Sequence, residues 1–237
     1  MLAERLQADE LMDDPALDAG TYQAVLHDLA SVNRTTFAYR PTLEFLARAI
    51  GRRKRFRLLD VGFGDGDMLR RIARWADRRG IAAELTGIDL NPRSIAAAEA
   101  TPWTGAPIRY LAGDYASLAG SGFEVVVSSL VAHHMTDGQL LAFLRFMERE
   151  SAAGWIVNDL HRHGFSHASF PLLASMMGWH RIVRLDGATS IARSYRPAEW
   201  PPILAEAGIS GARVHRRFPF RLCVEKNFQH GIGKYHS

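Results

Sequence analysis

The sequence predicts an α/β protein built on a doubly wound sheet of seven strands, mostly parallel, with the last strand antiparallel. Segments with strand character alternate with helical segments from about residue 56 to residue 160. This alternation is typical of a parallel sheet with right-handed crossovers. Two more strand-like segments, 211–218 and 220–225, follow near the end and turn on Pro219. With 237 residues, 47% of them hydrophobic, the chain is long enough to bury one large core.

The first 50 residues read as helical. One stripe of apolar residues follows the helical i, i+3, i+4, i+7 spacing clearly, and a second apolar stripe is weaker. A break is expected at 33–36, before another helix over 43–50. The clear stripe is Tyr22, Val25, Leu26 and Leu29, and the weak one is Leu2, Leu6, Leu11 and Met12. Because this region precedes the first strand, we expect it outside the α/β core, as either a mobile lid or a static cover.

The alternating region follows. Strands are expected at 56–61, 84–90, 108–111, 123–128 and 154–159, with helices at 68–79, 94–100 and 139–149 between them. The fourth strand is almost entirely apolar and β-branched, as expected for a strand buried on both faces.

Residues 160–196 break this rhythm, because the segment is too long for an ordinary connection. It contains an apolar helix over 165–179, and a further helix over 197–208 begins near a proline and ends at a glycine. We therefore expect a cover over 1–50, a main domain over 51–228 with 160–196 as a cap on the acceptor pocket, and a tail over 229–237.

Composition and charge narrow the functional classes. The formal net charge is +4, and the basic residues are mostly arginines scattered along the chain without a nucleic-acid-binding signature, so nucleic acid is disfavoured as a partner. Cys223 is the single cysteine, which excludes an intramolecular disulfide. No apolar run approaches the length of a membrane span, and the cytoplasm is the default location. A monomer and a homodimer remain open.

A glycine turn follows the first strand. Gly62, Gly64 and Gly66 alternate along it, whereas a dinucleotide fold prefers G-x-G-x-x-G, in which Asp67 would have to be glycine. Three carboxylates, those of Asp60, Asp65 and Asp67, flank the turn, and they would repel a pyrophosphate. The turn suits a ligand with an amino group and a sulfonium centre.

Four elements now point to one family. They are Leu59–Gly66, Gly87–Leu90, Ala112–Tyr115 and Phe123–Ser129, each at the end of a predicted strand. Together they resemble the class I S-adenosylmethionine-dependent methyltransferases of the small-molecule type, with one departure at Glu124, where the family more often has aspartate. The resemblance implies a Rossmann-like fold and S-adenosyl-L-methionine as methyl donor.

The resemblance also implies a set of cofactor-binding residues at the ends of the first four strands. Asp89 would accept hydrogen bonds from both ribose hydroxyls, and Asp114 would accept one from the adenine amino group. An N-cap role is the alternative for both. The full set is Asp60, Gly62, Phe63, Gly64, Gly66, Asp89, Leu90, Asp114, Tyr115, Ser129 and Leu130.

Acceptor residues are expected after the fourth and fifth strands. His134, with His133 second, is the candidate catalytic base, and the alternative is that one of them caps the next helix. Asp159 and His161 are candidates for orienting an acceptor. Met176 and Trp179 would line the cap. No metal is expected, because the histidines at 161, 163 and 167 lack the carboxylates that a metal site of this family uses.

These observations predict methyl transfer from S-adenosylmethionine to a small aromatic or lipophilic acceptor, with O-methylation favoured over C-methylation. An RNA or protein methyltransferase is the alternative among enzymes. A cofactor-binding subunit that has lost catalysis is the alternative of another class.

Overall fold

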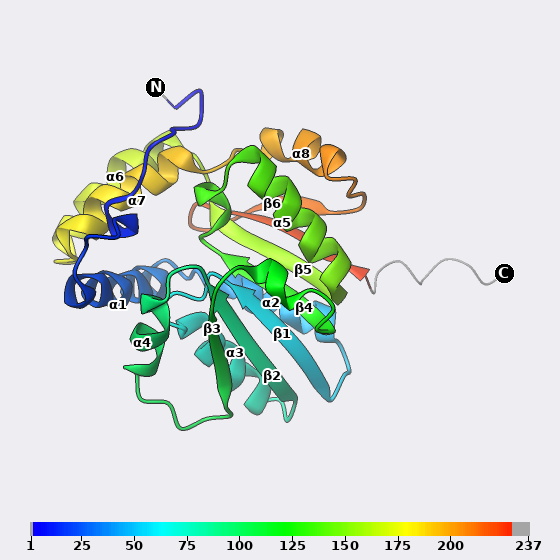
Figure 1. Ribbon diagram of the computed structural model, residues 1–237. Coiled ribbons are helices and arrows are strands. Elements are labelled where there is room, and N and C mark those ends of the chain that lie inside the picture. The colour runs from blue at the N-terminus through cyan, green and yellow to red at the C-terminus, as the bar shows by residue number, and fades with distance from the viewer. Residues whose placement is uncertain (1, 229–237) are drawn as a thin grey trace.

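The computed structural model describes residues 2–228, so the expected tail over 229–237 lies outside the described residues (Figure 1). The described chain forms a sheet in the order β3-β2-β1-β4-β5-β7-β6. β1 to β5 pair in parallel, whereas β7 runs antiparallel to both of its neighbours. The predicted fold class is therefore confirmed. The strands are β1 (Arg55–Val61), β2 (Ala82–Asp89), β3 (Ile108–Ala112), β4 (Phe123–Ser129), β5 (Ser151–Leu160), β6 (Arg213–Arg217) and β7 (Arg221–Asn227).

The strand order fixes where a ligand can bind. β1 lies between β2 and β4, so the chain winds outward in both directions from this point. In sheets of this kind the crevice outside the carboxyl ends of the strands, at the switch point, is the usual ligand site.

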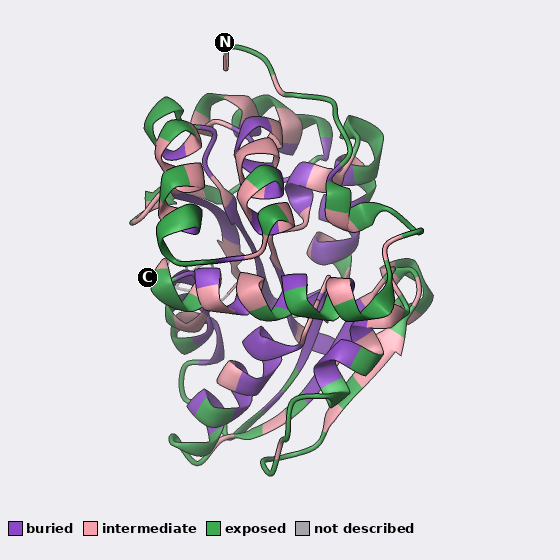
Figure 2. Ribbon diagram, turned by 90° about the vertical axis from the view of Figure 1, so that its left-hand side faces the viewer, coloured by how far each residue is buried: buried purple, intermediate pink, exposed green. Residues whose placement is uncertain are grey.

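Helices cover both faces of the sheet. α2, α3 and α4 pack on one face around Leu46, Leu69 and Ile72, and α5 and α8 pack on the other around Phe143 and Trp200. Figure 2 shows the buried sheet between helices whose outer faces are exposed. The helices are α1 (Ala19–Thr35), α2 (Arg40–Ile50), α3 (Asp67–Asp77), α4 (Arg93–Glu99), α5 (Asp137–Glu150), α6 (Gly164–Met176), α7 (Arg181–Arg193) and α8 (Trp200–Glu206), with short 3-10 turns η1 (Leu11–Asp13), η2 (Tyr115–Leu118), η3 (Ala132–His134) and η4 (Pro197–Glu199).

The first residues differ from the prediction. Residues 2–18 contain no α-helix and only the short turn η1, so the weak apolar stripe is not a helical face. The backbone instead bonds to distant elements: the Leu6 N–H donates to Ala192 O, and the Leu11 and Met12 N–H groups donate to Asp186. These partners satisfy donors that a helix would otherwise satisfy internally. We call residues 2–14 the strap.

The insertion after β5 also differs, because it forms two helices rather than one. Gly178, with φ +67°, ends the turn after α6, and the His180 side chain caps α7 by accepting from the Ile182 N–H. α6 and α7 pack beside α1 around Val25, Ala174 and Trp179 (Figure 1). This three-helix layer stands over the carboxyl edge of the sheet.

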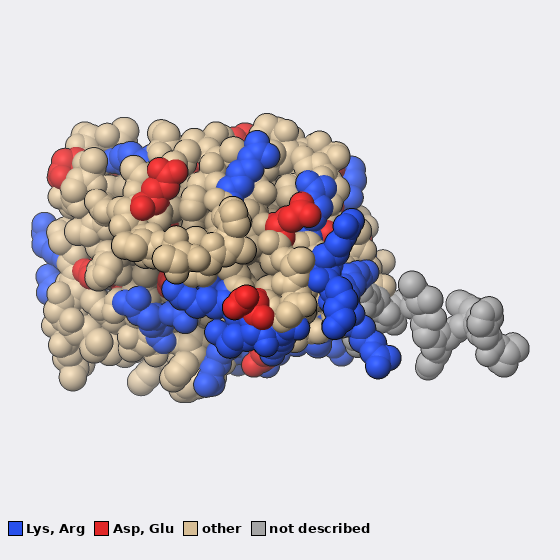
Figure 3. All heavy atoms as spheres, turned by 90° about the horizontal axis from the view of Figure 1, so that it is seen from below, with Lys and Arg blue, Asp and Glu red and all other residues tan. Residues whose placement is uncertain are grey.

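The surface is uneven in charge. Lys and Arg side chains gather on one part of the face that Figure 3 shows from below. Among the described residues, the structure has no helix with the length and hydrophobicity that a membrane crossing requires.

Candidate functional site

A cavity of about 490 Å³ lies between the carboxyl edge of the sheet and the layer of α1, α6, α7 and the strap. Its size is typical of small-ligand sites. The glycine turn, the ends of β2 and β4 and the start of η3 form its floor. Apolar side chains of the helical layer form its roof, among them Val25, Leu29, Phe170, Val183 and Ile191.

The glycine turn connects β1 to α3. Gly62, Gly64 and Gly66 all have positive φ angles, which L side chains rarely adopt. A Cβ at Gly62 would also collide with Val131, and one at Gly66 would collide with Tyr110. At Gly62 and Gly66 both the backbone conformation and the available space therefore require glycine. Gly62, Phe63 and Gly64 line the cavity, whereas Gly66 does not.

Asp89 ends β2 beside this turn. Its Oδ2 accepts a hydrogen bond from the Gly64 N–H at 3.0 Å, and its Oδ1 accepts one from the Asn91 N–H at 2.9 Å. Burial raises the pKa of Asp89, although these hydrogen bonds oppose the shift. The next residue, Leu90, is 75% exposed although it lines the cavity. An exposed leucine beside a fixed carboxylate suits a nucleoside, because the leucine can pack on the flat base and the carboxylate can accept hydrogen bonds from the ribose hydroxyls.

Asp60, near the end of β1, is a buried carboxyl group with an unsatisfied oxygen. The residue is 1% exposed, and its Oδ2 has no hydrogen-bond partner among the described residues. Burial, and then the charge of Asp89, raises the pKa of Asp60 to about 7. Since Asp60 lines the cavity, the amino group of a ligand would satisfy this oxygen and balance its charge.

The other expected cofactor residues divide into two groups. Ser129, the last residue of β4, and Leu130, which follows it with an unusual φ of +63°, line the cavity. Tyr115 also lines the cavity and packs against Phe143 and Phe146. Asp114, in contrast, is exposed and caps η2 by accepting from the Ala116 N–H, which is the alternative role that the sequence left open.

The two predicted catalytic histidines lie side by side in η3. His133 is buried, and its Nδ1 lies 2.7 Å from Asp159 Oδ1, while its backbone N–H donates to Asp159 Oδ2. Burial disfavours the imidazolium, but the charge and hydrogen bonds of Asp159 and Glu10 outweigh it and raise the pKa of His133 to about 9. The pKa of Asp159 falls to about 2, because its bonds to His133 outweigh its burial. His133 therefore holds its proton near neutral pH.

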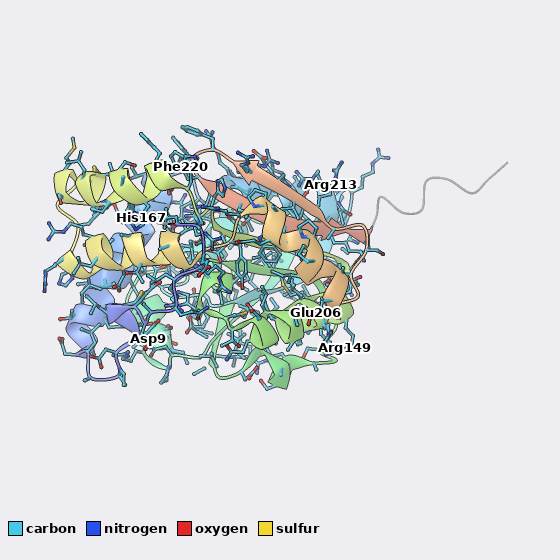
Figure 4. The ribbon with its side chains drawn as sticks, turned by 90° about the horizontal axis from the view of Figure 1, so that it is seen from above. Asp9, Arg149, His167, Glu206, Arg213 and Phe220 are labelled. Atoms are coloured by element: carbon cyan, nitrogen blue, oxygen red, sulfur yellow. The ribbon has the colours of Figure 1, made fainter. Side chains whose placement is uncertain are left out.

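The strap brings two carboxylates to the histidines, and no pattern in the sequence indicates this contact. Glu10 is 4% exposed and accepts a hydrogen bond from Ser190 Oγ on α7. Its oxygens lie 3.5 Å from His133 Nε2 and 3.8 Å from His134 Nε2. Asp13 Oδ2 lies 3.2 Å from His134 Nδ1. Figure 4 shows the segment that carries Asp9 beside α7.

Four residues expected at the acceptor do not line the cavity. Asp159 lies behind His133. His161 lines a smaller pocket of about 240 Å³ with Phe220. Met176 is 77% exposed, and Trp179 is buried against Phe170 in the helical layer. The local sequence does not indicate the direction of their side chains.

Sequence comparison identifies the central part of the chain. Residues 58–154 match the model of a family described as a methyltransferase domain. Uncharacterized methyltransferases of Mycobacterium tuberculosis and Mycobacterium bovis are 37% identical to the chain over 82 residues. That stretch covers 34% of this chain and 38% of these relatives.

Solved structures share the fold over most of the chain. The plantazolicin methyltransferase BpumL, in complex with a desmethylplantazolicin analog and SAH, has a TM-score of 0.63 at 14% identity, over 84% of this chain and 88% of its own. Human N-acetylserotonin methyltransferase, in complex with SAM, has a TM-score of 0.63 at 15% identity, over 94% of this chain and 60% of its own. Residues 58–154 are thus similar to a methyltransferase domain, as the four sequence elements predicted, and the solved methyltransferases share the fold of the chain.

Proposed function

We propose that the protein transfers a methyl group from S-adenosyl-L-methionine to a small, apolar or aromatic acceptor, with oxygen favoured over carbon as the methylated atom. The observation that carries this proposal is the cavity, which joins the glycine turn and Asp89 on its floor to an apolar roof and the His133–His134 pair. The floor suits the methyl donor and the roof suits the acceptor.

Different residues would bind different parts of the methyl donor. The Gly62–Gly64 backbone would lie against the methionine part of the cofactor, and the unsatisfied oxygen of Asp60 would take its amino group. Asp89 would hold the ribose hydroxyls, and Leu90 would pack on the adenine. Tyr115 and Asp114 would lie beside the adenine. When bound, S-adenosylmethionine supplies an electrophilic methyl group.

At the acceptor end the protein supplies alignment and a place for the acceptor's proton to leave. An in-line displacement needs the nucleophile, the methyl carbon and the sulfur in one line, and a shaped cavity provides this orientation. The lining favours an apolar body, because its accessible surface is mostly apolar. The polar end at His133 and His134 favours an acceptor with an ionisable hydroxyl. His134 is the more exposed of the two and is our candidate for contact with that hydroxyl.

A release assay for S-adenosylhomocysteine tests this proposal. The protein is incubated with S-adenosylmethionine and a panel of phenols and hydroxyquinones, and in parallel with RNA and with unfolded protein. We expect release with at least one class of small phenolic acceptor. Release with RNA or protein alone would replace the acceptor class. Tight binding of S-adenosylhomocysteine without release in any arm would favour a subunit that has lost catalysis.

A further inference from the structure

Three potential metal ligands converge at the acceptor end of the cavity. They are Glu10, His133 and His134, whose ligand atoms all lie within 4.8 Å of one another, and no other such group occurs in the searched range 2–228. The separations of 3.5 Å and 3.8 Å between the Glu10 oxygens and the two Nε2 atoms are close to ligand spacings around one ion. Two ligands about 2.1 Å from a tetrahedral ion lie roughly 3.4 Å apart.

Each histidine is also held from behind by a carboxylate. His133 Nδ1 lies 2.7 Å from Asp159, and His134 Nδ1 lies 3.2 Å from Asp13. Histidines that bind metals almost always donate their second ring N–H to a carboxylate or carbonyl group, which turns the other nitrogen toward the ion. Ser190 similarly fixes Glu10 through a 2.7 Å hydrogen bond to Oε1. All three candidate ligands thus have an outer partner.

The charge at the cluster favours a cation. Three carboxylates, Glu10, Asp13 and Asp159, surround the two imidazoles, and among the described residues the one guanidinium in an ion pair with any of them is Arg193, whose Nη1 lies 3.8 Å from Glu10 Oε1. An ion bound at Nε2 would displace the second proton of His133, and three carboxylates with one paired guanidinium would then leave two negative charges that a divalent cation cancels. Imidazole ligands suit zinc and neighbouring transition metals better than magnesium.

We propose that Glu10, His133 and His134 bind one divalent transition-metal ion of the zinc type, with a coordination position open to the cavity. This proposal departs from the sequence-based expectation of no metal. The catalytic consequence rests on the proposed function: an acceptor hydroxyl bound to the ion loses its proton to solvent more easily than the free hydroxyl does, and its oxygen then takes the methyl group. In this mode the histidines act as ligands, and the predicted base role is the alternative.

Direct metal binding tests the inference without cofactor or acceptor. The full chain is stripped with a chelator and desalted. It is then titrated with Co²⁺ while its visible absorption is followed, and bound Zn²⁺ is counted by elemental analysis after dialysis. We expect one ion per chain. Glu10→Gln and His134→Ala should each weaken binding by at least about ten- to a hundredfold, the loss typical when only a residue that supports a metal ligand is removed. His27→Ala, which removes a histidine with a 78% exposed side chain on α1, is the matched control and should bind as the wild type does.

Two results would overturn the inference: wild-type protein that retains no ion, or equal ion content in wild type, Glu10→Gln and His134→Ala. Circular dichroism establishes that each variant is folded. The thermal shift with Zn²⁺ gives a second measure, since it should occur in wild type and not in His134→Ala. Binding of S-adenosylhomocysteine is measured separately, so loss of the donor site and loss of the metal site give different outcomes.

Discussion

The Gly64 N–H donates a 3.0 Å hydrogen bond to Asp89 Oδ2, so the glycine turn and the tip of β2 form one rigid unit. Asp89 Oδ1 is held equally by the Asn91 N–H, and each oxygen keeps lone pairs for a ligand hydroxyl. Replacing Asp89 with alanine removes both acceptors and frees the turn. We expect S-adenosylhomocysteine affinity to fall by about ten- to a hundredfold, which isothermal titration measures. Asp77→Ala, at the exposed end of α3, is the control, and unchanged affinity in Asp89→Ala would refute the ribose assignment.

Asp60 should make stability depend on pH in an unusual direction. Its folded-state pKa of about 7 lies above the ordinary value of 3.8, so the fold favours the protonated form. The stabilisation from proton binding is complete at low pH and is lost as the pH rises through about 7. Asp60→Asn lacks this dependence. Relative to wild type, its free energy of unfolding should therefore be higher at pH 8 than at pH 5 by on the order of 2–4 kcal/mol.

Urea unfolding at the two pH values measures this difference for Asp60→Asn and wild type. A difference that does not change with pH would show that Asp60 ionises normally in the folded protein. The same variant should bind S-adenosylhomocysteine more weakly, since an amide cannot balance a ligand amino group by charge.

Asp186 holds the strap on α7. Both of its oxygens accept backbone hydrogen bonds of 2.9 Å, from Leu11 and Met12. In Asp186→Ala these bonds are lost, and the free energy that keeps the strap bound to α7 should fall by about 1–3 kcal/mol. We expect faster hydrogen exchange over residues 2–14 and little change in the sheet. Glu206→Ala, on the exposed face of α8, should leave strap exchange as in wild type, and protection of the strap in Asp186→Ala would argue against this tether.

Chelation distinguishes activation of the acceptor by a bound metal ion from proton removal by His134. If the ion at Glu10, His133 and His134 activates the acceptor, EDTA should lower methyl transfer at least tenfold while S-adenosylhomocysteine affinity stays the same. Adding Zn²⁺ should restore turnover. Full activity in EDTA would instead assign proton removal to His134 itself.

The roof of the cavity should control acceptor binding alone. Val183 is 1% exposed and lines the cavity from α7. A tryptophan at this position fills acceptor space, so the KM for the acceptor should rise about tenfold or more, with donor affinity unchanged. Leu172→Trp, at a 65% exposed position on α6, is the size-matched control. An equal loss of donor affinity in Val183→Trp would place the donor under this part of the roof instead.

The floor of the cavity could be predicted from sequence because its signals are local. The glycine turn, Asp89 and Ser129 each end a strand, and strands of one parallel sheet present these ends at one edge. Residues 2–12 were predicted wrongly as helical, because an apolar spacing does not reveal that their N–H groups bond to Asp186 and Ala192. The helix expected over 165–179 lies close to α6, whereas α7 was not predicted, because its apolar residues are not confined to one face.

Glu10 could not be predicted as a functional residue for a different reason. It meets His133 across 123 positions of chain, and only the path of the strap under α7 brings them together. A lone glutamate in a polar segment carries no sign of burial, whereas its 4% exposure in the fold makes it distinctive.

The division of the cavity between chain segments has an evolutionary consequence. The expected donor residues fall within positions 60–130, inside the matched domain at 58–154, whereas the roof comes from the strap, α1, α6 and α7 outside it. Mutations, insertions and exchanges in the roof can therefore alter which molecule is methylated while the donor site is inherited intact. Relatives that share only the central stretch can be expected to use the same donor and to differ in their acceptors.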